Sequence, residues 1–325
     1  MTKIYKYSLS LPGPLSLQLQ VPEPVFDRAE ARLLASAYLP GLRFVGADQL
    51  DQSQESCLQV SFIPSQKPRL RRLAQRVELY DRWQGQGSLL DLLHLSYSVC
   101  RLRWLEMGLY CVHSACVGKD SHTLLVGHSG SGKTTTALKM AESAGLQIFS
   151  GNKTLLAVGA DGIRAVAGTR TMTRTAAAEK ASQVQAVDQS PACLAVGYQE
   201  RLAYSLDEGA YSSAQSVPVS AIALIRLNDG VQEETALESL SAMHKLFPFF
   251  LDMVNADTVL GAGAVVFSGS AGKRGDAGQK QVLSRALAAA LKAVPVYSLS
   301  GSLDFVADRL ESLQVQQVKE VSCRI

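Results

Sequence analysis

Apolar and polar positions alternate in short runs of strand type along the first part of the chain. Residues 4–9, 15–21 and 57–63 have this pattern and are bounded by turn-forming residues, which is typical of β-strands. Residues 25–38 instead repeat apolar positions at helical spacing and predict one helix among those strands. The pattern therefore predicts a small α+β domain at the N-terminus.

A longer helical repeat follows at residues 88–107, where apolar side chains recur near helical spacing. We expect a long helix that leads into the next domain, and we place the boundary at its start. The predicted organisation is a small α+β domain at residues 1–87 and a larger α/β domain at residues 88–325. The chain is long enough for both, because single cores rarely grow beyond about 250 to 300 residues.

The larger domain alternates strand and helix patterns around tight turns. Apolar runs at residues 109–117 and 122–126 flank a turn sequence and predict a β-hairpin. Residues 134–144 carry helix-forming side chains, and Gly145 is placed to end that helix. The remaining predicted elements are strands at residues 146–158, 162–166, 221–227 and 264–267, helices at residues 233–246 and 279–292, a flexible loop at residues 270–278, and a strand and helix within residues 294–313.

Composition and charge narrow the classes of partner. Hydrophobic residues make up 47% of the chain and charged residues 19%, as in ordinary globular proteins. The net charge of +3 is too small to indicate nucleic-acid binding without a local cluster. The nearest cluster, residues 67–76, is either a basic docking face or, by preference, the solvated face of a helix. Signal-peptide and membrane-span patterns are absent, so we expect a cytoplasmic protein without a membrane partner.

The strongest motif is at residues 127–134, which match G-x-x-x-x-G-K-[ST] in full between an apolar strand and a helix. Glycines in such a loop let backbone N–H groups turn toward phosphates, and the helix start adds the positive end of its dipole. We expect Lys133 to contact the β- and γ-phosphates and Thr134 to ligate magnesium. The predicted ligands are Mg²⁺ and ATP, with GTP as the alternative, and the predicted binding residues are Gly127, His128, Ser129, Gly130, Ser131, Gly132, Lys133, Thr134 and Thr135.

A phosphate-binding loop is shared by motors, switches and kinases, so neighbouring acidic residues must indicate the chemistry. Most such enzymes present an Asp at the end of a nearby apolar strand. The strand after the loop's helix, within residues 147–153, contains no carboxylate. Asp229 follows the apolar run at residues 221–227, but Asn228-Asp229-Gly230 is also a turn sequence, and we prefer the turn.

The stretch from residue 109 to residue 166 resembles the HPr kinase/phosphorylases and their single-domain relatives, whose catalytic fold is similar to that of phosphoenolpyruvate carboxykinase. The resemblance rests on a strand with a histidine (Val112-His113-Ser114-Ala115) before the hairpin, the loop, the short helix and the strand at residues 148–152. It implies an α/β fold with a P-loop kinase domain of this type. Two interpretations of His113 stay open: a core histidine on a sheet, or a residue with a role near the γ-phosphate.

The resemblance implies a kinase that transfers the γ-phosphoryl group of ATP to a serine-type hydroxyl of a peptide, protein or small molecule. His113, Lys133 and Asn152 are the catalytic candidates. The chain departs from the family after the loop's helix, where paired aspartates, one of them the proposed general base, are replaced by Gly151 and Asn152. The glycine-rich signature that engages HPr is also missing, so HPr is not the expected acceptor.

Positive charge near the transferred group has three further candidates, Lys153, Arg170 and Arg174, although we prefer a surface position for each. The competing interpretation is an ATP-binding scaffold or regulatory subunit without kinase turnover. The missing carboxylates and the separate N-terminal domain favour it. A homo-oligomer or a partner subunit is compatible with either interpretation.

Overall fold

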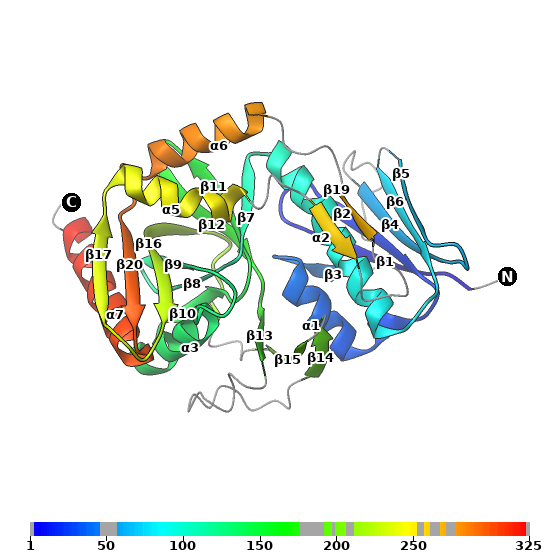
Figure 1. Ribbon diagram of the computed structural model, residues 1–325, viewed down its shortest axis with the longest axis horizontal. Coiled ribbons are helices and arrows are strands. Elements are labelled where there is room, and N and C mark those ends of the chain that lie inside the picture. Colours follow the sequence, from blue (N-terminus) through cyan, green and yellow to red (C-terminus); the bar gives the residue numbers. More distant parts are fainter. Residues whose placement is uncertain are drawn as a thin grey trace.

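The chain is a mixed α/β protein built around two main sheets (Figure 1). No helix within the described part is both long and apolar enough to cross a membrane. We call residues 3–106 the N-terminal unit and residues 109–322 the C-terminal unit. The computed structural model describes residues 3–45, 57–73, 75–175, 192–196, 199–205, 211–251, 257–260, 267–270 and 277–322.

The N-terminal unit is a six-stranded sheet in the order β3-β1-β2-β4-β6-β5, with helices packed against it (Figure 1). The strands predicted at residues 4–9, 15–21 and 57–63 are confirmed as β1, β2 and β4. The helix predicted at residues 25–38 is divided at Arg28 into a short 3-10 turn and α1. The elements are β1 (Tyr5–Ser10), β2 (Ser16–Val21), η1 (Val25–Asp27), α1 (Ala29–Tyr38), β3 (Arg43–Val45), β4 (Cys57–Pro64), β5 (Arg69–Arg72), β6 (Arg76–Asp81) and α2 (Gln86–Glu106).

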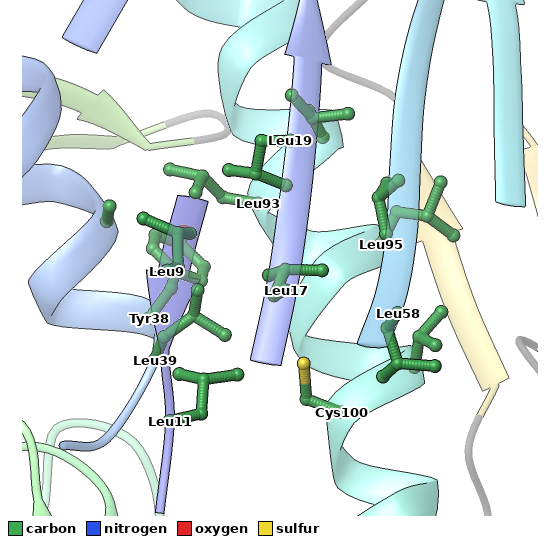
Figure 2. Packing of buried hydrophobic residues seen from close by; sticks show 14 of the residues in the cluster. Leu9, Leu11, Leu17, Leu19, Tyr38, Leu39, Leu58, Leu93, Leu95 and Cys100 are labelled. Atoms are coloured by element: carbon green, nitrogen blue, oxygen red, sulfur yellow. The ribbon is translucent and has the colours of Figure 1, made fainter. Parts of the chain in front are cut away.

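The long helix α2 packs into the core of the first sheet. Leu93 and Leu95 of α2 are fully buried in one cluster with Leu17 and Leu58 of the sheet, and Figure 2 shows part of this cluster. Burying one such side chain contributes about 1.5 to 3 kcal/mol. The predicted helix at residues 88–107 is therefore confirmed, but its packing joins it to the strands that precede it. The boundary at residue 87 stays a prediction.

The second sheet has nine strands and is covered on both faces. Leu124 of β9 faces a cluster that includes α5 and α6, whereas its neighbour Leu125 faces a cluster that includes α3 and α7. This alternation follows from the two-residue period of a strand. The elements are β7 (Leu109–Val112), β8 (Ser114–Gly118), β9 (His122–Val126), α3 (Lys133–Ala144), β10 (Gln147–Ser150), β11 (Thr154–Gly159), β12 (Gly162–Gly168), β16 (Val217–Leu227), β17 (Glu233–Leu237), α5 (Ser239–Leu251), α6 (Ala277–Ala290), β20 (Val296–Gly301) and α7 (Leu303–Ser322).

The path of the second sheet is β10-β8-β9-β16-β12-β11-β7, and β20 and β17 continue it beside β16. The predicted hairpin of β8 and β9 is confirmed, as is the hairpin of β11 and β12. Gly145 ends α3 in the left-handed conformation, as predicted. Two smaller sheets complete the described chain, formed by β13 (Thr171–Thr175), β14 (Ala192–Val196) and β15 (Gln199–Ser205), and by β18 (Asp257–Leu260) and β19 (Phe267–Ser270).

Three sequence predictions of secondary structure are wrong. Residues 233–237 form strand β17 and not the start of a helix, because pairing with β20 overrides the helix propensity of glutamate and alanine. Residues 109–117 are not one strand, since a bend at His113 separates β7 from β8. Residues 146–158 are likewise divided into β10 and β11. The break at His113 lets the two strands pair with different neighbours, because β7 pairs with β11 whereas β8 pairs with β9 and β10.

The basic cluster at residues 67–76 is not a helix face either. Arg69–Arg72 form the edge strand β5, which pairs with β6. Arg76 forms an ion pair with the buried Glu78 at 2.8 Å. Charged side chains on an edge strand discourage pairing with other chains. Most of the strand predicted at residues 264–267 and of the loop predicted at residues 270–278 lies outside the described residues.

Candidate functional site

The loop at residues 127–132 connects β9 to α3 at one edge of the second sheet. β9 runs parallel to β16, with Val126 opposite Leu224, so both strands end beside the loop. The backbone N–H of Leu227 donates a 3.0 Å hydrogen bond to the carbonyl of Ser131. The loop is thus fixed to β16, while its tip at residues 128–130 is exposed to solvent.

Two glycines of this loop have no room for a side chain. A Cβ on Gly132, whose φ is +96°, would lie 2.3 Å from the side chain of Leu227. A Cβ on Gly127 would lie 2.5 Å from the hydroxyl of Ser131 and 2.7 Å from the carbonyl oxygen of Ile225. Contacts this short do not occur at real Cβ atoms, so the close approach of loop and strand requires glycine at both positions.

Lys133, the first residue of α3, places its ammonium inside the loop. The residue is only 6% exposed, and Nζ donates to the carbonyl of Gly127 at 2.8 Å and to that of His128 at 2.9 Å. Burial lowers the pKa of Lys133 from 10.5 to about 8. No carboxylate of the described residues forms an ion pair with it. A buried cation with only carbonyl partners favours an incoming anion.

The hydroxyl groups next to Lys133 complete a cradle for phosphate. Thr134 Oγ1 donates to the carbonyl of Gly151 at 3.4 Å, just beyond the end of β10. Ser131 Oγ is buried and has no hydrogen-bond partner among the described residues. The start of α3 adds free N–H groups and the positive end of its dipole. These features fit a polyphosphate, and the ligation of magnesium by Thr134 stays a prediction.

His113 lies at the bend between β7 and β8 and is exposed. The interpretation as a core histidine is therefore wrong. The next residue, Ser114, pairs with Val126, which directly precedes Gly127. The backbone of His113 is thus held close to the start of the loop, and its role near the γ-phosphate stays a prediction.

A buried chain of hydroxyl groups fixes the strands beneath this bend. Ser114 Oγ donates to Thr154 Oγ1 at 2.8 Å, and Thr154 Oγ1 also hydrogen-bonds Ser150 Oγ. All three residues are at 0% relative exposure. The chain joins β8, β10 and β11 and so sets the position of His113 relative to the turn that follows β10. Sequence reasoning missed this set because nothing in the spacing brings the three strands together.

Asn152 and Lys153 in that turn contact the N-terminal unit. Asn152 Nδ2 donates to the carbonyl of Ala37 at 3.2 Å, and Lys153 Nζ donates to that of Tyr38 at 3.3 Å. Both acceptors lie at the carboxyl end of α1, where the helix dipole favours a cation. Nζ of Lys153 also lies 4.0 Å from the ring centroid of Tyr97, and burial lowers its pKa to about 8. The interpretation of Lys153 as a surface charge is wrong.

The other charged candidates are peripheral. Arg170 is exposed, with its guanidinium 5.8 Å from the ring centroid of Tyr211. Asp229 is exposed in a turn in which Gly230 N donates to Asn228 Oδ1 at 2.8 Å, so the preferred turn interpretation is confirmed. The side chain of Arg174, on β13, lies outside the described part. Thr134 is the predicted loop residue that the structure brings into contact with the turn after β10.

No protein-family model matches the chain, and no curated protein matches its sequence. The function must therefore be inferred from the loop, its neighbours and the chemistry that they permit.

Proposed function

We propose that this chain is an ATP-dependent kinase that resembles the HPr kinases and transfers the γ-phosphoryl group to a serine-type hydroxyl. The observation that carries the proposal is the buried ammonium of Lys133, held by two loop carbonyls at the start of α3. Its desolvation costs stability in the free protein, and a phosphate anion offsets that cost. A structural turn would gain nothing from such a lysine.

The residues of the loop bind and neutralise the triphosphate. Backbone N–H groups at Gly130 and at residues 132–134 and the hydroxyl of Ser131 are the hydrogen-bond donors, and Lys133 supplies the positive charge. Thr134 would hold the metal ion, and magnesium would supply further neutralisation of the phosphate oxygens. Positioning and charge neutralisation account for most of the acceleration in phosphoryl transfer.

The reaction exchanges one P–O bond for another. The bond from the γ-phosphorus to the β–γ bridging oxygen breaks, a bond from that phosphorus to the acceptor oxygen forms, ADP leaves, and the hydroxyl proton passes to water or to a base. Asn152 orients a hydroxyl but takes no proton, so the exposed imidazole of His113 is the proposed proton acceptor. A positioned base contributes about 100- to 10,000-fold, so a kinase without the aspartate pair is expected to be slow.

The alternative function is an ATP-binding scaffold, and one observation favours it. Asn152 stands where the resembling family has its catalytic aspartates, and its amide is bonded to the carbonyl of Ala37 in the N-terminal unit. Thr134 contacts the carbonyl of the preceding residue, Gly151. In a scaffold, bound nucleotide would act through these contacts on the position of α1.

Mass spectrometry separates the two functions. The protein is incubated with MgATP and a panel of hydroxyl-bearing peptides and small molecules, with the Lys133→Met variant as the control. A kinase adds the mass of one phosphoryl group to an acceptor and forms ADP in equal amount, and the variant does not. A scaffold binds ATP but yields neither product, and that result would end the kinase proposal.

A further inference from the structure

A pocket of about 710 Å³ lies between the two units, next to the candidate site. The N-terminal unit contributes the carboxyl end of β1 and the segment from α1 to β3. The C-terminal unit contributes Phe149 of β10, the end of β12 and residues 212–215. A hydrogen bond of 3.0 Å from Gly41 N to the carbonyl of Gly168 joins the two walls. The volume suits a small organic molecule.

The lining of the pocket is cationic and polar. Arg43 comes from the N-terminal unit and Arg170 from the C-terminal unit, and they are the only charged residues of the lining. Neither forms an ion pair with an acidic residue of the described part. Ser36 and Ser212 are among its four serines. Arginine binds carboxylate and phosphate through paired N–H donors. The lining therefore selects an organic anion, and apolar residues such as Phe149 contact the rest of the molecule.

Hydrogen bonds connect the pocket wall to the phosphate loop. Thr169, between the lining residues Gly168 and Arg170, accepts a 2.9 Å hydrogen bond at its carbonyl from Gly151 N. The carbonyl of Gly151 accepts in turn from Thr134. Two hydrogen bonds, both made by Gly151, therefore connect this wall to Thr134, the residue that is proposed to hold magnesium.

The opposite wall of the pocket meets the same turn. Asn152 bonds the carbonyl of Ala37, and the neighbouring residues Ser36 and Leu39 line the pocket. The turn that follows β10 is therefore hydrogen-bonded to residues adjacent to both walls of the pocket.

We propose that this pocket binds the phosphoryl acceptor, a small organic molecule with a hydroxyl group and an anionic group of carboxylate or phosphate type. Arg43 and Arg170 hold the anionic group. That the ligand accepts a phosphoryl group rests on the proposed kinase function, whereas its negative charge is inferred from the pocket alone. On transfer, the hydroxyl oxygen gains the γ-phosphoryl group, ADP leaves, and the hydroxyl proton goes to water.

Binding of three matched probes tests the ligand class by saturation-transfer NMR and calorimetry. Glycerate carries a carboxylate, glycerol 3-phosphate carries a phosphate, and glycerol carries only hydroxyls. Wild-type protein should bind at least one of the two anions and not glycerol, and the stronger one identifies the anionic group. Arg43→Gln combined with Arg170→Gln should weaken that binding at least about tenfold, because charge-assisted contacts contribute about 1.5 to 3 kcal/mol each.

Two further variants keep the outcome unambiguous. Arg72→Gln removes an exposed arginine of β5 outside the pocket and should leave probe binding unchanged. Ala214→Trp fills the pocket from an exposed position and should abolish probe binding without loss of folding. MgATP affinity should be the same in all of these proteins.

Probe binding that is absent from the wild type, or that survives both the arginine changes and Ala214→Trp, would overturn the pocket assignment. MgATP binding would be untouched by that result, so the proposed function would stand. The reverse pattern is arginine-dependent probe binding without transfer of a phosphoryl group to the bound anion. That result would support the anion-binding pocket and contradict the proposed kinase function.

Discussion

Replacing Lys133 with methionine separates the contribution of this residue to stability from its contribution to ligand binding. Methionine keeps an unbranched apolar side chain in a position that is only 6% exposed and removes the ammonium group. A pKa lowered from 10.5 to about 8 corresponds to about 3 kcal/mol of unfavourable desolvation, at roughly 1.36 kcal/mol per pKa unit. The variant is relieved of that cost.

The variant also loses the two hydrogen bonds from Nζ to Gly127 and His128, which contribute about 0.5 to 1.5 kcal/mol each. The two effects nearly cancel. We therefore expect the free energy of unfolding to stay within about 1 kcal/mol of the wild type or to rise by about that amount. Affinity for MgATP should fall about 10- to 150-fold, because a charge-assisted contact contributes about 1.5 to 3 kcal/mol.

Urea unfolding followed by circular dichroism measures the first quantity, and titration calorimetry measures the second. Lys139→Met is the matched control. It lies on the same helix, is paired with Asp304 at 3.1 Å on the surface, and should leave MgATP affinity unchanged. A loss of several kcal/mol of stability with unchanged MgATP affinity in Lys133→Met would show that the lysine serves packing and would refute this reasoning.

Three other changes test the site. Gly132→Ala should lower the free energy of unfolding by more than about 2 kcal/mol and abolish MgATP binding, because the new Cβ would lie 2.3 Å from the side chain of Leu227. Gly130→Ala has nothing within 4 Å of its Cβ and should lower the free energy of unfolding only by the roughly 1 to 2 kcal/mol that a positive φ costs. Urea unfolding measures both changes. Because burial lowers the pKa of Lys153 from 10.5 to about 8, the unfolded chain binds the extra proton between these pH values, and the contribution of Lys153 to stability rises with pH across that window. Lys133 has the same shift, so in urea unfolding the difference in the free energy of unfolding between the wild type and Lys153→Met should rise with pH in this window, while the part that Lys133 contributes stays in both proteins. Asn152→Asp should increase ADP formation in coupled assays if the chain is a kinase limited by its missing base, and weaker MgATP binding without turnover would instead support the scaffold.

Local patterns predicted the parts of the site that depend on consecutive residues. The sequence from Gly127 to Thr134 specified the loop, the helix after it and the cap at Gly145, because glycine placement and helix propensity act over a few residues. The hairpin of β8 and β9 followed from two apolar runs around a turn sequence. Each of these elements forms largely within its own segment.

Long-range contacts account for what the sequence did not predict. Residues 233–237 have helix-forming side chains, yet they form a strand because they pair with β20. The contact of Asn152 with Ala37 joins residues 115 positions apart, and no spacing rule reports it. The pocket has the same origin, since Arg43 and Arg170 come from different units. Contacts between segments far apart in the sequence decided these features.

Calorimetric titration of the wild-type protein with MgATP, MgADP and MgAMP is the most direct test of the proposed phosphate cradle. In the proposed mode of binding, Lys133, Ser131 and Thr134 address phosphates beyond the first. We expect MgATP to bind at least about tenfold more tightly than MgADP, and MgAMP to give no measurable heat. Equal affinity for MgATP and MgAMP, or no binding of any of the three, would contradict a triphosphate site at this loop.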